Sequence, residues 1–216
     1  MTYSQGDIYK GQFFNNKANG FGEYYHQNGG IYTGYWEDNI QENIGIETWS
    51  DKSKYFGDYT NGKKEGIGTY FLENGSIYKG ELKNNYIEGY GIFKFFDGRI
   101  YKGQWIQNMM WGYGEFIWNQ DKKYCGFYKN DKKDGFGIFK TKGNKFFVGF
   151  WKEGKQEGIG KYFIDNNIRY GIWKNGKREN EIFSEEEFIS RFNSNEAKYI
   201  NVFQWNLEKI KNFMNT

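Results

Sequence analysis

The stretch Tyr101–Lys123 reads YKGQWIQNMMWGYGEFIWNQDKK and decides how the rest of the chain is interpreted. It contains Tyr-x-Gly-x-Trp, a turn, Gly-x-Gly, an aromatic residue and a second turn. The same pattern returns every 23 residues in both directions along the chain. A fixed period of this length, held through seven copies, indicates an array of repeats in which each copy is one supersecondary unit.

Three rows of residues define this lattice. A leading aromatic residue stands at Tyr9, Tyr32, Tyr55, Tyr78, Tyr101, Tyr124, Phe147 and Tyr170. Two residues after it comes Gly11, Gly34, Gly57, Gly80, Gly103, Gly126 or Gly149. The glycine pair recurs as Gly20/Gly22, Gly66/Gly68, Gly89/Gly91, Gly112/Gly114, Gly135/Gly137 and Gly158/Gly160. Only the second copy departs from this Gly-x-Gly pair, because Asn43 stands in place of its first glycine, before Gly45.

Each copy predicts two short antiparallel strands. In Tyr55–Tyr59, the alternation of a strand places Tyr55, Gly57 and Tyr59 on one face. Asn-Gly and Asp-Gly pairs such as Asn28-Gly29 are strong signals for a hairpin turn. Residues that tolerate positive φ also follow each leading aromatic residue by seven positions, at Asn16, Asn39, Gly62, Asn85, Asn108, Asp131 and Gly154. We therefore expect an all-β repeat array, an elongated single antiparallel meander sheet of about fourteen strands, two per repeat.

The predicted array covers residues 1–181, with seven full repeats from Tyr9 and a terminal half-repeat at 170–178. We expect residues 182–216 to form a C-terminal helical segment, because Ser184–Glu187 reads as a capping box. An amphipathic stripe follows at Ile200, Phe203, Leu207, Ile210 and Met214. Either this helix lies on the face of the last repeats that carries the aromatic rings, or it mediates self-association or binds a partner protein.

Composition fits a thin sheet rather than a thick aliphatic core. Aromatic residues make up 22% of the chain, glycine counts 30 and proline is absent. Cys125 is the single cysteine, so an internal disulfide is excluded and a reducing, cytoplasmic compartment is expected. We see neither an N-terminal signal pattern nor an apolar run of membrane-spanning length.

The net charge is unevenly distributed. Residues 1–100 carry a net charge of −3, residues 101–180 carry +8, and residues 181–216 carry −2. The basic block over the later repeats is either ordinary solubilising lysine or a surface for an acidic partner, such as anionic lipid or an acidic protein.

The sequence offers little for catalysis. His26 is the only histidine, and no serine or cysteine stands beside it in a recognisable motif. One histidine and one cysteine cannot build a zinc site. The Gly-x-Gly pairs recur in every repeat and lack the Lys-Ser/Thr of a phosphate loop. We therefore expect a protein that is not an enzyme, needs no cofactor and no metal, and does not bind nucleic acid.

The unit YxGxWxxGxxxGxG, repeated with this period from residue 9 to about 178, resembles the MORN (membrane occupation and recognition nexus) repeat. The resemblance implies an elongated, curled β ribbon. Members of the family are mostly scaffolds: some are ciliary, including radial-spoke-head proteins, some lie on cortical or basal cytoskeleton, and others join membranes. Some members carry a catalytic domain after the repeats, for which the residues that follow this array are too few.

We accordingly expect a structural scaffold for protein–protein contacts in a cytoskeletal assembly, with the cilium or axoneme as the setting that the resemblance favours. The predicted partner-binding residues are Trp36, Tyr59, Trp105, Tyr128, Trp151, Ile200, Phe203, Leu207 and Ile210. For any single ring the competing interpretation is that it belongs to the core of the sheet. The alternative function is a membrane-surface adaptor that binds anionic phospholipid through Lys122, Lys123, Lys132, Lys133, Lys177 and Arg178. Homodimerisation is left open.

Overall fold

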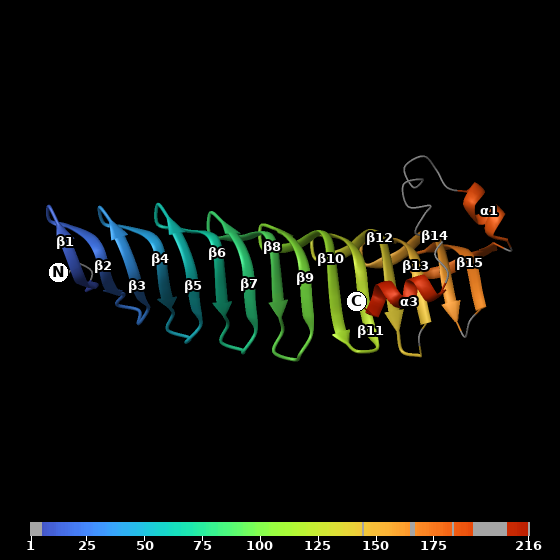
Figure 1. The fold of residues 1–216 in the computed structure, drawn as a ribbon, viewed down its shortest axis with the longest axis horizontal. Helices are drawn as coiled ribbons and strands as arrows, with labels where there is room; N and C mark the ends of the chain where they lie inside the picture. The colour runs from blue at the N-terminus through green and yellow to red at the C-terminus, as the bar shows by residue number, and fades with distance from the viewer. Residues whose placement is uncertain (1–5, 144, 165–166, 183, 192–206, 216) are drawn as a thin grey trace. The chain divides into compact units, whose positions relative to one another are not determined.

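The computed structural model is an antiparallel meander sheet in which the strands β1 to β16 lie in sequence order, each hydrogen-bonded to the next (Figure 1). The structure describes residues 6–143, 145–164, 167–182, 184–191 and 207–215. The predicted all-β repeat fold is confirmed.

The strands are β1 (Ile8–Phe14), β2 (Lys17–Tyr25), β3 (Ile31–Glu37), β4 (Ile40–Thr48), β5 (Lys54–Thr60), β6 (Lys63–Phe71), β7 (Ile77–Lys83), β8 (Tyr86–Lys94), β9 (Ile100–Ile106), β10 (Met109–Asn119), β11 (Lys122–Lys129), β12 (Lys132–Thr141), β13 (Lys145–Lys152), β14 (Lys155–Ile164), β15 (Asn167–Lys174) and β16 (Lys177–Ile182). The described helices are α1 (Glu185–Ser190) and α3 (Leu207–Asn215). The Glu187 amide donates to Ser184 Oγ over 3.0 Å, so the predicted N-cap of the first helix is present.

The strand count exceeds the expected fourteen because the incomplete last copy still forms a hairpin. β15 and β16 pair from Tyr170↔Ile182 to Lys174↔Lys177. The turn between them is Asn175-Gly176, with φ values of 50° and 82°. Two successive residues with positive φ make the tight hairpin turn that joins antiparallel strands, so no Gly-x-Gly pair is needed to close the sheet here.

The chain forms two compact units. Unit 1 comprises Met1–Gly98 with Gln104–Asn108, and unit 2 comprises Arg99–Gly103 with Met109–Thr216. Unit 1 therefore contains β1 to β8, and unit 2 contains β10 to β16 with both helices. The boundary between the units divides β9.

The predicted turn residues all have positive φ. Their φ values run from 60° at Asn16 to 83° at Gly154. The first glycine of each Gly-x-Gly pair also has positive φ, between 60° and 104°. Asn43, which replaces that glycine in the second copy, has a φ of 59°. Asparagine tolerates this left-handed conformation better than most residues, so the departure in sequence preserves the backbone.

Rings cover glycines on one side of the sheet. Gly57 and Gly68 are directly paired, and a Cβ on Gly57 would lie 2.6 Å from the Gly68 Cα. The Tyr55 ring occupies this space, and its hydroxyl donates to the Asp58 carbonyl over 3.0 Å. The leading aromatic residues from Tyr9 to Phe147 are at most 1% exposed. We call this side the ring face.

The opposite side, which we call the back face, carries the residue after each leading aromatic residue and the residue between the two glycines. These positions alternate with the ring-face positions along each strand. The two faces therefore hold different rows of side chains, and each row can be followed by the period of the repeat.

From the second repeat on, the turn inside each repeat is bonded to the strand of the preceding repeat. The Asn85 amide donates to the Lys64 carbonyl over 3.0 Å, and the Lys64 amide donates to Asn85 Oδ1 over 2.8 Å. Asn39 makes the same pair of bonds with Ala18. The turn residue thus has two roles, since it adopts positive φ and also links neighbouring repeats.

Helix α3 packs on its own sheet in unit 2, where it lies over β12 and β13 (Figure 1). It covers the back face, and the ring face that we considered from the sequence is not its site on the sheet. Ile210 is 0% exposed and Met214 is 2% exposed, and both join a cluster with Phe136, Ile138 and Val148. The ring face already has rings over its glycines, whereas the back face of unit 2 presents these aliphatic and aromatic side chains. The helix therefore buries the apolar surface that the sheet leaves uncovered.

Candidate functional site

Most of the rings predicted to bind partners are buried. Tyr59, Trp105, Tyr128 and Trp151 are 2–7% exposed, and Trp36 is partly buried. Each of the four buried residues packs edge-on against a leading aromatic residue; the Tyr59 ring centroid, for example, lies 5.1 Å from that of Tyr32 at 84°. Their packing favours the competing interpretation, in which these rings form the core of the sheet.

The buried polar atoms of these aromatic residues differ in whether they have a hydrogen-bond partner. The indole N–H groups of Trp36 and Trp105 donate to the carbonyls of Gly22 and Gly91, at 3.3 and 3.4 Å. Among the described residues, Trp151 Nε1 and the Tyr128 hydroxyl have no hydrogen-bond partner.

The predicted residues of the C-terminal segment are only partly described. Ile200 and Phe203 lie outside the described residues. Leu207 begins α3, and Ile210 is fully buried in the unit 2 cluster. Ile210 therefore serves the fold of this chain and presents no surface to a partner.

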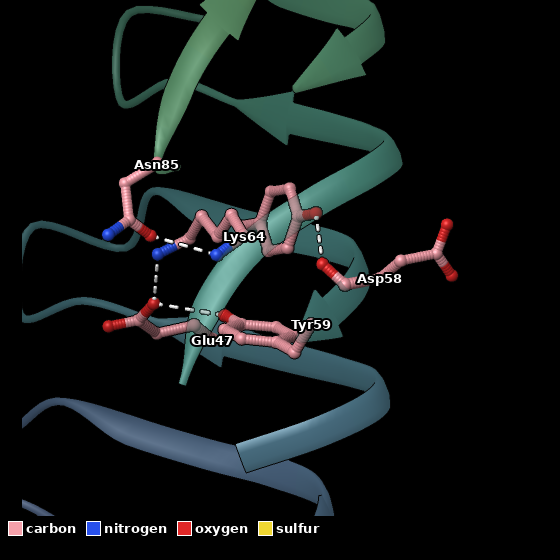
Figure 2. A network of polar contacts seen from close by, with 6 residues as sticks. Glu47, Asp58, Tyr59, Lys64 and Asn85 are labelled. Carbon is pink, nitrogen blue, oxygen red and sulfur yellow. Dashed lines mark hydrogen bonds and ion pairs between the residues drawn. The ribbon is translucent and has the colours of Figure 1, made fainter. Parts of the chain in front are cut away.

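An ion pair interrupts the ring face of unit 1 (Figure 2). Glu47 stands where other copies carry an aromatic residue, and its carboxylate accepts from Lys64 Nζ over 2.5 Å and from the Tyr59 hydroxyl over 3.1 Å. The Lys64 ammonium also lies 5.1 and 5.2 Å from the ring centroids of Trp49 and Tyr55. Both charges are largely buried but mutually compensated, as a buried pair requires.

Lys133 occupies the equivalent position in unit 2, and no carboxylate of the described residues pairs with it. Its ammonium lies 4.4 Å from the ring centroids of Phe139 and Trp151, and 5.1 Å from those of Trp118 and Tyr124. Burial, with a smaller contribution from the nearby charge of Lys122, lowers the pKa of Lys133 from 10.5 to about 8. Lys133 is thus held by aromatic rings and is not a free surface charge.

The remaining basic candidates do not form one open patch. Lys123 pairs with Glu115, Lys132 with Glu153, and Arg178 with Glu181. Lys122 lies 5.0 Å from the Trp118 ring centroid, and Lys177 is exposed. Three of the six basic candidates are therefore paired with carboxylates of the chain, so the six residues do not act as one block of free charge.

The residues considered for catalysis do not assemble into a reactive site. Burial raises the pKa of the Cys125 thiol to about 12, which disfavours the nucleophilic thiolate. His26 is partly exposed, and its Nδ1 lies 3.7 Å from the Asp7 carboxylate. The part of the chain that the structure describes holds no group of three potential metal ligands and no helix long and apolar enough to span a membrane.

Sequence reasoning overlooked the back face of unit 1. The residue before the second glycine of the Gly-x-Gly motif is exposed in the first four copies, with exposed fractions of 47–54%: Phe21, Ile44, Ile67 and Tyr90. The period of the repeat contains the signal, because this apolar row alternates with the glycines and must point away from the rings. Exposed large apolar side chains in a contiguous row are typical of an interaction surface.

Comparison with known proteins identifies the repeat. The family model of the MORN repeat matches residues 9–31, 32–54, 55–77, 78–98, 101–121, 124–145 and 147–168. No curated protein matches the chain.

Two solved structures have some similarity to the fold. The TCP domain of SAS-4 from Drosophila melanogaster, in complex with a proline-rich motif of Ana2, has 11% identity and a TM-score of 0.47, covering 81% of this chain and 94% of that chain. The TCP10 domain of CPAP from Danio rerio, in complex with a peptide of STIL, has 10% identity and a TM-score of 0.49, covering 83% of this chain and 78% of that chain. At these scores the similarity carries no argument about function.

Proposed function

The chain belongs to the MORN repeat family, and on that premise we propose that it is a non-catalytic scaffold that binds other proteins on its sheet. The observation that carries this proposal is the exposed apolar row on the back face of unit 1. The row is rigidly spaced, because turns bonded to the preceding repeat hold the strands in register. A rigid surface with regularly spaced apolar side chains can bind a partner with little ordering cost.

The test is a cross-linking pull-down from native cells with the full chain as bait and an unrelated β-sheet protein of similar size as control. We expect a small set of proteins that only the full chain captures. Capture of the same proteins by both baits, or of none, would contradict the scaffold function.

We propose a cytoskeletal setting, the cilium or axoneme in particular. The support is the resemblance of the repeat to those of radial-spoke-head and other ciliary members of the family. A fluorescent tag on the full chain should then follow the length of the axoneme. A signal distributed evenly through the cell body would argue against this setting.

The membrane-adaptor alternative has weaker support, because Lys123, Lys132 and Arg178 are ion-paired within the chain. It still makes a clear prediction for flotation with vesicles that contain acidic phospholipid. Binding would have to fall steeply with added salt, and also when Lys122 and Lys177 are changed to glutamate. If the chain does not float with such vesicles at low salt, the adaptor function is excluded.

A further inference from the structure

One part of the exposed back face of unit 1 is equivalent, by the period of the repeat, to a part of unit 2 that helix α3 covers. The β3–β6 patch consists of five exposed residues on four successive strands: Tyr35, Ile44, Ile46, Phe56 and Ile67. Their exposed fractions lie between 42% and 54%. Ile46 is paired directly with Phe56, so the patch is continuous from strand to strand.

The residues four repeats further along belong to the surface against which α3 packs. They are Phe127, Phe136, Ile138, Val148 and Ile159, on β11 to β14. The last four are buried in the unit 2 cluster, to which the helix contributes Ile210 and Met214, and Phe127 packs against that cluster. Each position of the β3–β6 patch therefore has an apolar counterpart in a surface that a helix covers.

The dimensions of a helix fit the patch. The nine residues of α3 measure about 13 Å along the helix axis. Four neighbouring strands span about 14 Å between their outer axes. A helix of similar length that crosses the strands would cover β3 to β6 as α3 covers β11 to β14.

Charged residues limit the apolar surface on the side of the later repeats. At back-face positions of the fourth and fifth repeats, the sequence places the charged residues Lys79, Glu81, Lys102 and Glu115. An apolar helix face would have to desolvate these charges, which is unfavourable. The surface suited to a helix is thus bounded on the side of the later repeats, and it is separated along the chain from the site of α3.

Charge distinguishes the two sites. Asp58 is paired with Ile44, and Glu81 with Ile67, so two carboxylates border the patch. Each accepts a backbone amide over 3.0 Å, from Ile67 and Tyr90 respectively, and keeps further lone pairs for another donor. In the site of α3 the matching positions are the apolar residues Phe150 and Ile172. The occupant of the patch must therefore bring cations to its edges.

From these observations we infer that the β3–β6 patch binds an amphipathic helix of a partner protein, with an apolar stripe against Ile46 and Phe56 and with lysine or arginine beside Asp58 and Glu81. This inference rests on the proposed scaffold function and specifies the ligand of that surface. A second copy of this chain is a poorer occupant, because its own α3 is already buried against its own sheet.

The test selects a helical ligand directly. The probe is a phage-displayed library of helical peptides of about 16 residues, long enough to cross the patch, with an apolar stripe varied among Leu, Ile, Phe and Met and with flanks varied between Lys and Glu. The immobilised target is the full chain. We expect enrichment of peptides with Lys flanks. These peptides should bind the Phe56→Glu variant about tenfold or more weakly than they bind the wild-type chain.

Phe96→Glu is the matched control, because Phe96 is 68% exposed and lies outside the patch. This variant should bind the selected peptides as the wild type does, and both variants should keep the thermal unfolding of the wild type since both positions are exposed. Failure to enrich any helix, enrichment of Glu flanks, or equal binding to Phe56→Glu would each overturn the inference. If the wild-type chain still captures specific proteins from cells in those cases, the scaffold function stands and only the helical ligand is wrong.

Discussion

Lys64 and Lys133 occupy equivalent positions three repeats apart, but among the residues that the structure describes only Lys64 has a carboxylate partner. Lys64 lies over Trp49 and Tyr55, and Lys133 lies over their counterparts Trp118 and Tyr124. The place of Glu47 is taken by Phe116 in the later copy. One site is a compensated ion pair, and the other is a desolvated cation among rings.

The same substitution at these two lysines should have opposite effects on stability. Lys64→Met leaves the Glu47 carboxylate partly buried without its cation, and we expect a loss of about 2 kcal/mol. Lys133→Met removes a desolvated charge and keeps the apolar stem, so we expect a gain of about 1 kcal/mol. Urea unfolding at pH 7, followed by tryptophan fluorescence, measures both. Equal losses in the two variants would refute the distinction.

Stability should depend on pH in the alkaline range. The folded chain loses the Lys133 proton above a pKa of about 8, whereas the unfolded chain keeps it to about 10.5. Between these values the unfolded state binds more protons, so the free energy of unfolding should rise with pH, by at most about 3 kcal/mol from this group. Burial also lowers the pKa of Lys161, which adds to the rise in the same direction.

The rise should level off above about pH 9, because burial also raises the pKa of the Cys125 thiol from 9.0 to about 12 and the unfolded chain loses that proton first. Near pH 10 the tyrosines should turn the plateau into a fall. Burial raises the pKa of Tyr32, Tyr55 and Tyr78 above the ordinary value, so these hydroxyls ionise in the unfolded chain first and stability falls. Urea unfolding at pH 7, 8, 9, 10 and 11 should show a maximum. The Lys133→Met variant should have a smaller rise, and an unchanged pH profile in that variant would contradict the role of Lys133.

Gly103→Val should be strongly destabilising. A Cβ at Gly103 would lie 2.5 Å from the Tyr101 hydroxyl and 2.6 Å from the Gly114 Cα, and the latter is backbone that cannot swing aside. We expect a cost of about 3 kcal/mol from overpacking, measured by urea unfolding. Gly75→Asn is the control, because Gly75 has a φ of 85° that asparagine tolerates and a Cβ added there would have no atom within 4 Å. A loss in the control equal to that of Gly103→Val would show that any glycine replacement is harmful.

Ile210→Asp should detach α3 from the back face of unit 2. Ile210 is 0% exposed, and a carboxylate in its place has no partner in the surrounding apolar cluster. We expect faster amide hydrogen exchange in β12 and β13 and unchanged exchange in β4 and β5. Asn212→Asp is the matched control, because Asn212 is exposed on the same helix. Wild-type exchange in β12 and β13 of the Ile210→Asp variant would mean that the helix contributes little to that face.

The sequence by itself determined the repeat, the strands and the turns. These features depend on short-range chemistry: Asn16 and its counterparts adopt positive φ because of their residue type, and alternation within a strand assigns Tyr55 and Gly57 to one face. Even the departure at Asn43 was visible, although its conformational reason became clear only from the φ of 59°.

Only the tertiary structure decided which surfaces are covered. The stripe of α3 predicts that Ile210 is buried, but nothing local distinguishes the ring face from the back face as its site. Likewise, the period cannot reveal that Glu47 meets Lys64, since the two residues lie in successive repeats and only strand packing brings them together. Burial and charge pairing arise between segments that are distant in sequence. The surface that stays exposed is therefore determined by the tertiary structure and not by local sequence.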